Sequence, residues 1–212
     1  MKKPRLILAD DHKIVLDGLR GILAEEFELV GEATNGRELM ELAQSHKPDV
    51  IVADISMPLL NGIDAAKQLR DQGSTAKVVF LTMHPDQTYA TRALDAGASA
   101  YVLKHAASDE LVAAIKEALR GGVYLSAQLR TPAMQEALSN ESKIKTVVEL
   151  TPRQRDVLQL FAEGKSAKEV ATILNISPRT AETHKYKIMD ELGLKTSAEL
   201  VQYAIRHGLV SG

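Results

Sequence analysis

Residues 50–54 read VIVAD, an apolar run that ends on a carboxylate, and this arrangement recurs through the first half of the chain. The runs LILADD (6–11), VVFLT (78–82) and YVLK (101–104) also end on polar side chains. Short apolar runs between helical patterns are typical of parallel strands that are buried on both faces of a sheet. Ligands of such sheets bind beyond the carboxyl ends of the strands, so the sequence predicts a polar site at that edge.

Five side chains are expected to meet at this edge. They are Asp10, Asp11, Asp54, Thr82 and Lys104. A carboxylate cluster with one lysine indicates a site for a hard cation such as Mg2+, beside a group that can carry a phosphoryl. Each side chain alone has another explanation, because Asp11 and Thr82 can cap helices and Lys104 can simply be solvated. Their coincidence at neighbouring strand ends favours one common site.

The composition predicts a two-domain protein of the cytoplasm. The chain has 212 residues, 45% of them hydrophobic and 25% charged, as in soluble globular proteins. Its apolar runs are too short and too often interrupted by charge for a transmembrane helix, and its first residues lead into a strand rather than a signal peptide. The lack of cysteine excludes disulfides, thiolate metal sites and cysteine nucleophiles, and it agrees with a reducing compartment.

The first 122 residues alternate between strand and helix patterns five times. Strands are expected at about 5–10, 28–33, 49–54, 77–82 and 99–103, and helices at about 12–25, 35–47, 62–71, 86–96 and 108–120. This alternation predicts an α/β domain with a parallel sheet and helices on both faces. Residues 123–148 are predicted to be a linker, in which 127–138 can form a helix.

From residue 150 onward the pattern is purely helical. Helices are expected at about 152–163, 166–174, 178–192 and 197–207, an all-α domain of four helices within 149–212. The helix starts are marked by Ser177-Pro178 and by three expected capping boxes, namely Thr151 with Gln154, Ser166 with Glu169 and Thr196 with Glu199. Residues 149–212 contain nine basic against eight acidic side chains, so charge alone does not indicate nucleic-acid binding.

Residues 1–122 resemble the receiver domain of bacterial two-component response regulators. The resemblance lies in Asp10-Asp11, in Asp54-Ile55-Ser56-Met57-Pro58 with Asn61-Gly62, in Thr82, and in Tyr101-Val102-Leu103-Lys104. It implies a flavodoxin-like (βα)5 fold with a parallel sheet of order 2-1-3-4-5. It also implies Mg2+ as cofactor and a sensor histidine kinase, or a small acyl phosphate, as phosphoryl donor.

The same resemblance implies roles for the carboxylates. Asp54 is implied to be the phosphoacceptor. Asp11, Asp54 and the backbone carbonyl of Ser56 are implied to hold Mg2+, and Asp10 to bind it mainly through water.

The remaining receiver residues are implied to stabilise the phosphoryl group and to form the switch. Lys104 would pair with one phosphoryl oxygen and Thr82 would hydrogen-bond another. Tyr101 would fill the space that the moving hydroxyl of Thr82 vacates, although an ordinary half-buried strand aromatic remains an alternative for it. Phosphoryl transfer depends on positioning and cationic stabilisation, which agrees with these roles.

Residues 149–212 resemble the LuxR-type helix-turn-helix output domain. The match lies in 150–158, in Gly164-Lys165-Ser166, in 180–184 and in Leu192-Gly193. It implies that the helix 178–192 enters the major groove of double-stranded promoter DNA. Base edges would face Glu182, Thr183 and Tyr186, and phosphates would contact Lys165, Arg179, Lys185 and Lys187. The residue pattern by itself also fits a solvated charged helix.

The two resemblances together imply a response regulator of the nitrate-regulator-like subfamily. Such a protein is a transcription factor rather than an enzyme; it forms a homodimer on DNA when phosphorylated and needs no membrane. One alternative is a DNA-binding regulator whose receiver is a phosphorylation-independent dimerisation module; the intact set of five site residues argues against it, and only the bulky Met83 and the lack of proline after Lys104 argue for it. Another is an aspartate-nucleophile phosphatase, but that chemistry needs a second acid where Ser56 stands.

Overall fold

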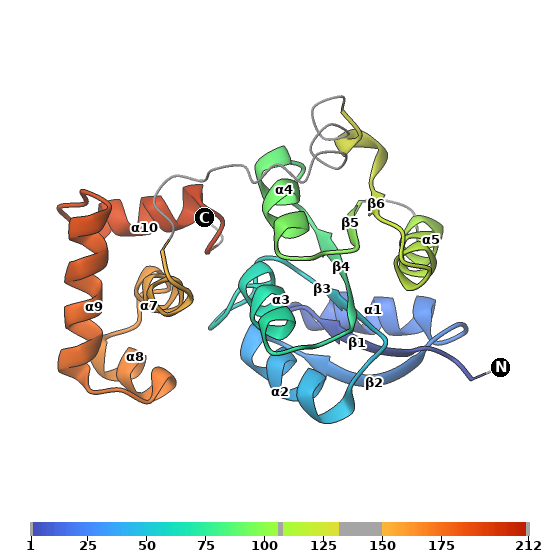
Figure 1. Cartoon of the computed structure of the whole chain (residues 1–212), viewed down its shortest axis with the longest axis horizontal. Coiled ribbons are helices and arrows are strands. Elements are labelled where there is room, and N and C mark those ends of the chain that lie inside the picture. The colour runs from blue at the N-terminus through green and yellow to red at the C-terminus, as the bar shows by residue number, and fades with distance from the viewer. Residues whose placement is uncertain (1, 106–107, 132–149, 211–212) are drawn as a thin grey trace. The chain divides into compact units, whose positions relative to one another are not determined.

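A computed structural model of the chain describes residues 2–105, 108–131 and 150–210. These residues form two compact units, the first within 2–57 and 61–131 and the second containing 150–210 (Figure 1). No helix in the described ranges is both long enough and apolar enough to cross a membrane.

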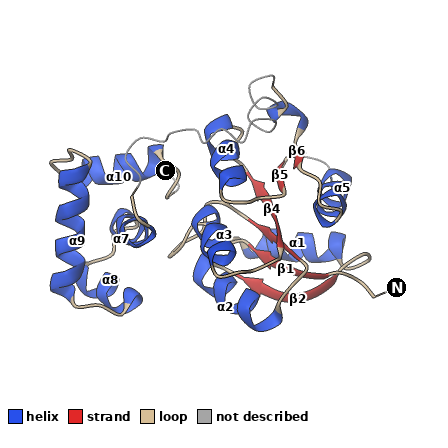
Figure 2. Ribbon diagram, in the orientation of Figure 1, coloured by secondary structure: helices blue, strands red, loops and turns tan. Residues whose placement is uncertain are grey.

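The N-terminal unit alternates strands and helices as predicted. Its elements are β1 (Arg5–Ala9), α1 (Lys13–Leu23), β2 (Glu28–Ala33), α2 (Gly36–His46), β3 (Val50–Ala53), α3 (Gly62–Asp71), β4 (Lys77–Thr82), α4 (Gln87–Asp95), β5 (Ala100–Leu103), α5 (Ser108–Leu119), β6 (Tyr124–Leu125) and the short 3-10 helix η1 (Ala127–Leu129). The strands pair in parallel in the order β2-β1-β3-β4-β5-β6, with helices on both sides of the sheet (Figure 2). The predicted α/β fold is confirmed, and the predicted strand order holds for the first five strands.

The core explains why the strand sequences are apolar throughout. On one face of the sheet, Leu8 and Val52 pack against Leu16 of α1 and Ile115 of α5, and all four side chains are buried. Every residue of β3 and of β5 is also buried, as expected for strands that are covered by helices on both faces. Apart from Arg5 and Lys77, the first residues of β1 and β4, no charged side chain lies within the inner strands, and the charged groups of the edge come where those strands end.

The sheet has a sixth strand, β6, in the stretch that was predicted to be a linker. The backbone amide of Tyr124 donates to the Ser99 carbonyl at 3.0 Å, and that of Ser126 donates to the Tyr101 carbonyl at 3.0 Å. The predicted linker therefore does not begin at residue 123. A strand of two residues is too short to produce a period-two pattern, which explains why it was missed.

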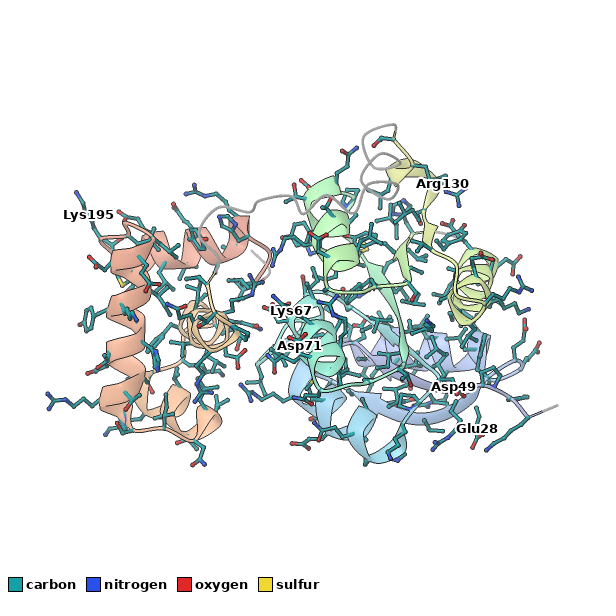
Figure 3. The ribbon with its side chains drawn as sticks, viewed as in Figure 1. Glu28, Asp49, Lys67, Asp71, Arg130 and Lys195 are labelled. Carbon is teal, nitrogen blue, oxygen red and sulfur yellow. The ribbon has the colours of Figure 1, made fainter. Side chains whose placement is uncertain are left out.

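Of the helix expected over 127–138, residues 127–131 are described and contain η1, whereas 132–138 lie, like the rest of the predicted linker up to 148, outside the described residues. After η1, Arg130 turns back onto β6, where its Nε donates to the Leu125 carbonyl at 2.7 Å (Figure 3). Its guanidinium carbon also lies 5.0 Å from the centre of the Tyr124 ring. These contacts tie the residues after β6 to the sheet edge.

The C-terminal unit consists of the four predicted helices. They are α7 (Pro152–Ala162), α8 (Ala167–Leu174), α9 (Pro178–Glu191) and α10 (Ser197–Arg206). Val157, Val170, Ile188 and Leu200 each come from a different helix and are almost fully buried together. Each apolar stripe thus closes a common core, and the polar face of α9 is left outside it.

Helix starts in this unit follow the predicted capping chemistry with one exception. The boxes at Thr151 and Ser166 are complete. At the start of α10, Thr196 accepts from the Glu199 amide at 3.2 Å, but the Glu199 carboxylate accepts from the Lys195 amide at 2.6 Å. The third expected box is therefore incomplete, because an amide one residue earlier takes the carboxylate.

Candidate phosphoryl site and nucleic-acid interface

The carboxyl ends of four neighbouring strands, β1, β3, β4 and β5, form the predicted polar edge. Asp10 and Asp54 directly follow β1 and β3, which are paired through Ala9 and Ala53. Thr82 is the last residue of β4 and is paired with Leu103, so Lys104 follows beside it. Four of the five side chains that were expected at this edge, Asp10, Asp54, Thr82 and Lys104, therefore lie at neighbouring strand ends.

Lys104 connects the two buried carboxylates. Its Nζ lies 2.6 Å from Asp54 Oδ2 and 2.7 Å from Asp10 Oδ2. Asp10 is 2% exposed and Asp54 is 6% exposed, so both charges are largely removed from water. Ionised carboxylates at such depth need a cation to compensate them, and the ammonium supplies one.

The electrostatics of these groups follow from burial and pairing. Burial raises the pKa of the Asp54 carboxyl above its ordinary value, although its contact with Lys104 acts in the opposite direction. For Lys104, burial alone would lower the pKa of the ammonium, but the hydrogen bonds and charges of Asp10 and Asp54 outweigh it and raise the pKa. Asp54 is therefore a carboxylate held in a low-dielectric site beside a firmly charged lysine.

Close backbone packing fixes the position of Asp54. Its Oδ1 accepts from the Ile55 amide at 2.6 Å. Gly62, the first residue of α3, donates its amide to the Ile55 carbonyl at 2.8 Å, and Asn61 caps the helix by accepting from the Asp64 amide. A β-carbon at Gly62 would lie 2.1 Å from the Asp54 carbonyl oxygen. Only glycine permits this approach, which explains the Asn-Gly step at this point.

Asp11 joins Asp10 and Asp54 in a group that can hold a cation. One ligand atom each from Asp10, Asp11, His12 and Asp54 all lie within 4.8 Å of one another. Asp11 does not cap α1, because the N-cap of this helix is His12.

Thr82 and Tyr101 are both buried and are connected through His84. The Thr82 hydroxyl oxygen accepts from the His84 amide at 3.3 Å, and the Tyr101 hydroxyl donates to the His84 carbonyl at 2.8 Å. The N-cap of α4 is Asp86, so Thr82 does not cap that helix. Tyr101 is fully buried rather than half-buried, and the segment after β4 thus links the site to β5.

The second candidate site is the outer face of α9. Helix α9 follows α8 after a short turn in which Asn175 adopts a left-handed conformation with φ 53°. The residues that were predicted to meet bases are exposed on it, with Tyr186 the most prominent at 68% exposed. Ala181 and Ile188 face the core instead. This arrangement is the geometry of a helix-turn-helix, in which the second helix presents a polar face.

The basic residues predicted to contact phosphates differ in their exposure and in their contacts with other residues. Arg179 is exposed, whereas Lys165, which lies before α8, is only partly exposed. Lys187 is exposed, and its Nζ lies 3.8 Å from Oε1 of Glu191, one helical turn later. Lys185 is more constrained, because its Nζ donates to Ser197 Oγ at 3.0 Å and lies 4.9 Å from the centre of the Phe161 ring.

Comparison with known proteins identifies both domains. The model of the response regulator receiver domain matches residues 6–116, more than half of the chain. The model of the bacterial regulatory proteins of the luxR family matches residues 148–204. The chain belongs to the response regulators. It is a phosphorylation-regulated transcription factor with a LuxR-type DNA-binding domain.

Individual response regulators resemble the chain over nearly its whole length. The transcriptional regulatory protein MctR of Rhizobium johnstonii is 39% identical over 99% of this chain and 96% of its own. The oxygen regulatory protein NreC of Staphylococcus aureus is 35% identical, covering 97% of this chain and 99% of its own. The RcsB response regulator of Salmonella typhimurium superposes with a TM-score of 0.64 at 28% identity, over 98% of this chain and 99% of the other.

Two contacts of this response regulator were not predicted from its sequence. The Nδ1 atom of His12 lies 3.1 Å from Asp10 Oδ1 and 3.0 Å from Asp11 Oδ1. Ser56 Oγ lies 2.8 Å from His84 Nε2, and the His84 ring stacks on Tyr89 of α4 with centroids 4.4 Å apart. The position of His12 directly after Asp10-Asp11 was a usable signal, whereas the distance between Ser56 and His84 depends on two loops that come together only in the fold.

Proposed function

We propose that Asp54 is the phosphoacceptor of this response regulator and that its phosphorylation controls DNA binding by the C-terminal domain. The observation that carries the proposal is the position of Lys104 Nζ, 2.6 Å from Asp54 Oδ2 and 2.7 Å from Asp10 Oδ2. An ammonium at this place can neutralise an oxygen of a phosphoryl group on Asp54. Such cationic stabilisation is the main requirement of phosphoryl transfer.

The acidic residues fit Mg2+ as the cofactor. Carboxylate oxygens from Asp10, Asp11 and Asp54 lie within 4.8 Å of one another, and hard cations prefer such oxygen ligands. In our proposal Asp11, Asp54 and the backbone carbonyl of Ser56 hold Mg2+, and Asp10 binds it through water. When bound, Mg2+ supplies positive charge beside the phosphoryl oxygens.

The donor is a sensor histidine kinase or a small acyl phosphate. An Asp54 carboxylate oxygen forms the new bond to phosphorus while the bond from phosphorus to the donor group breaks, and the donor leaves as histidine or as a carboxylate. Lys104 then pairs with one phosphoryl oxygen and the Thr82 hydroxyl hydrogen-bonds another. Because the Thr82 oxygen now accepts from the His84 amide, its movement would loosen the segment that Tyr101 contacts, and Tyr101 completes the switch.

The output is binding of a homodimer to promoter DNA in the cytoplasm. Glu182, Thr183 and Tyr186 are proposed to read base edges, and Lys165, Arg179, Lys185 and Lys187 to contact phosphates. The exposed face of α9 supports this assignment. We do not propose a phosphatase activity. Such an enzyme needs a second acid at the position of Ser56, and the hydroxyl of this serine instead pairs with the His84 ring.

The decisive experiment compares the wild type with Asp54→Ala. Each full-length protein is incubated with acetyl phosphate or phosphoramidate and Mg2+ and is then analysed by intact mass and by sizing. We expect one phosphoryl adduct and a shift towards the dimer for the wild type, and neither for Asp54→Ala. A wild type without an adduct would refute the proposal.

A further inference from the structure

His12 occupies an unusual position at the rim of the acidic pocket. It is the N-cap of α1, but its side chain makes no capping hydrogen bond, unlike the Ser, Thr, Asp or Asn that normally stabilise this position. Its backbone amide donates to Asp10 Oδ1 at 2.9 Å, which fixes the residue beside the pocket. Helix stability therefore does not explain a histidine here, and the ring instead faces carboxylates.

The ring nitrogen lies at distances that match a coordination sphere. His12 Nδ1 is 3.1 Å from Asp10 Oδ1 and 3.0 Å from Asp11 Oδ1. Adjacent ligand atoms of an octahedral ion with bonds of about 2.1 Å lie about 3.0 Å apart. The nitrogen is thus spaced from Asp11 Oδ1, a direct ligand of the proposed site, as a neighbouring ligand of the same ion would be, and its contact with Asp10 Oδ1 holds the ring beside the residue that binds the ion through water.

Lys104 does not compete for this position. It contacts Asp10 Oδ2 and Asp54 Oδ2, whereas His12 contacts the other oxygen of Asp10. The ammonium and the imidazole therefore approach Asp10 from different sides. The His12 side chain is 63% exposed, so the side of the pocket that it borders is open to ions from solvent.

We propose that His12 is a nitrogen ligand of the divalent cation in this pocket and that the pocket therefore binds Mn2+ and Co2+ more tightly than Mg2+. Nδ1 donates its lone pair to the ion and Nε2 carries the ring proton towards solvent. Imidazole suits transition metals, whereas Mg2+ prefers oxygen ligands and keeps several waters, so a mixed nitrogen and oxygen set favours the former ions. The inference rests on the proposed metal site of Asp10, Asp11 and Asp54.

The spectroscopic test uses Mn2+ as the probe with the full chain. Loss of the free-ion electron paramagnetic resonance signal measures binding, and electron spin-echo modulation detects a coordinated nitrogen. We expect nitrogen modulation in the wild type and in His84→Ala, whose ring is bonded to Ser56. The modulation should vanish in His12→Ala and in His12→Gln, which keeps a hydrogen-bond donor but lacks an imidazole.

Affinities separate a ligand from a residue that merely orients the carboxylates. Loss of an orienting partner weakens the binding of every metal by a similar factor, commonly about 10- to 100-fold. Loss of a nitrogen ligand should lower the affinity for Co2+ and Mn2+ about tenfold or more, while the affinity for Mg2+ should change by less than about threefold. Equal losses for the three ions, or Mn2+ bound without nitrogen modulation, would overturn the inference and leave the phosphoacceptor proposal standing. Asp54→Asn tests the underlying metal site. If that variant bound Mn2+ as tightly as the wild type, the ion would lie elsewhere, and both this inference and the proposed metal site of Asp10, Asp11 and Asp54 would be overturned.

Discussion

At the scale of single residues, Asp54 shows how a buried carboxylate is kept at a cost in stability. Its carboxylate is buried, and burial raises its pKa despite the nearby ammonium of Lys104. The folded protein therefore binds a proton at this group more tightly than the unfolded chain does. The carboxyl stabilises the fold while it is protonated, and this contribution is lost as the pH rises through the raised pKa.

The variant Asp54→Asn should consequently be more heat-stable than the wild type at neutral pH. Its side chain is uncharged at every pH, so the advantage should shrink as the pH falls and the wild-type carboxyl becomes protonated. Thermal unfolding across a pH series without divalent cations measures this difference. Asp71→Asn, at the exposed end of α3, controls for the loss of one carboxylate (Figure 3). An advantage that grows towards acid pH would contradict the expectation.

Gly62 is the second residue on which the site depends. The change Gly62→Ala would place a β-carbon 2.1 Å from the Asp54 carbonyl oxygen and 3.1 Å from Phe80 Cε1. Overpacking commonly costs about 1–3 kcal/mol, and backbone atoms yield less than side chains, so we expect a loss of about 3 kcal/mol or more.

Gly18→Ala is the matched control for this substitution. Gly18 lies within α1, and a β-carbon at this residue would meet no other atom within 4 Å. Alanine is the better helix former, so this change should add up to about 1 kcal/mol. Denaturant unfolding measures both variants, and the phosphorylation rate with acetyl phosphate should also fall for Gly62→Ala alone. Equal stability of the two variants would show that the loop after β3 is freer than the structure indicates.

The sequence predicted the positions of Asp10, Asp54 and Lys104 because each one directly follows a strand. An apolar run, its end and the parallel topology are local properties that together place Asp10, Asp54 and Lys104 at one edge. The pairing of Ser56 with His84 depends instead on the path of two loops between different strands, and no local pattern encodes that distance. His12 lay within reach, since it follows Asp10-Asp11 directly.

At the scale of elements, predictability followed length. The five long strand and helix repeats were found from their periodicity, whereas β6, with two residues, gave no period. What holds β6 is non-local: Ser126 Oγ accepts from the Leu103 amide at 3.2 Å and donates to Glu110 Oε1 at 2.5 Å. A tertiary partner thus defines an element that its own sequence does not.

Two lysines of α9 separate DNA contact from structural support. Lys187→Ala should weaken binding to promoter and random duplexes alike and reduce the salt slope by about one, because it removes one phosphate contact. Lys185 is already bonded to Ser197 and lies over Phe161, so Lys185→Ala should also lower the unfolding free energy of the C-terminal unit by about 0.5–1 kcal/mol. Binding measured over a salt series, together with denaturant unfolding, distinguishes the two effects. An unchanged salt slope for Lys187→Ala would reject its phosphate role.

At the scale of the whole molecule, the question is how much a phosphoryl group on Asp54 changes the affinity for DNA. Each unit has its own core, so the phosphoryl group can act on DNA binding only through a shift between states of the chain that bind DNA differently. Couplings of this kind are typically about 1–3 kcal/mol, or about 5- to 150-fold in affinity. A complete conversion from one state to the other would need about 5.5 kcal/mol.

We therefore expect acetyl phosphate with Mg2+ to raise the affinity of the wild type for promoter DNA by about 5- to 150-fold and to leave Asp54→Ala unchanged. The gain should depend steeply on protein concentration, because a dimer on paired half-sites gains affinity from assembly as well as from contact. Titrations of labelled duplex at several protein concentrations, each checked by intact mass for the adduct, measure both effects. If the wild type carries the adduct, is a dimer both with and without it, and keeps the same affinity, the receiver is a dimerisation module that does not respond to phosphorylation. That result would leave the chemistry of Asp54 intact and remove its role as the input of the switch.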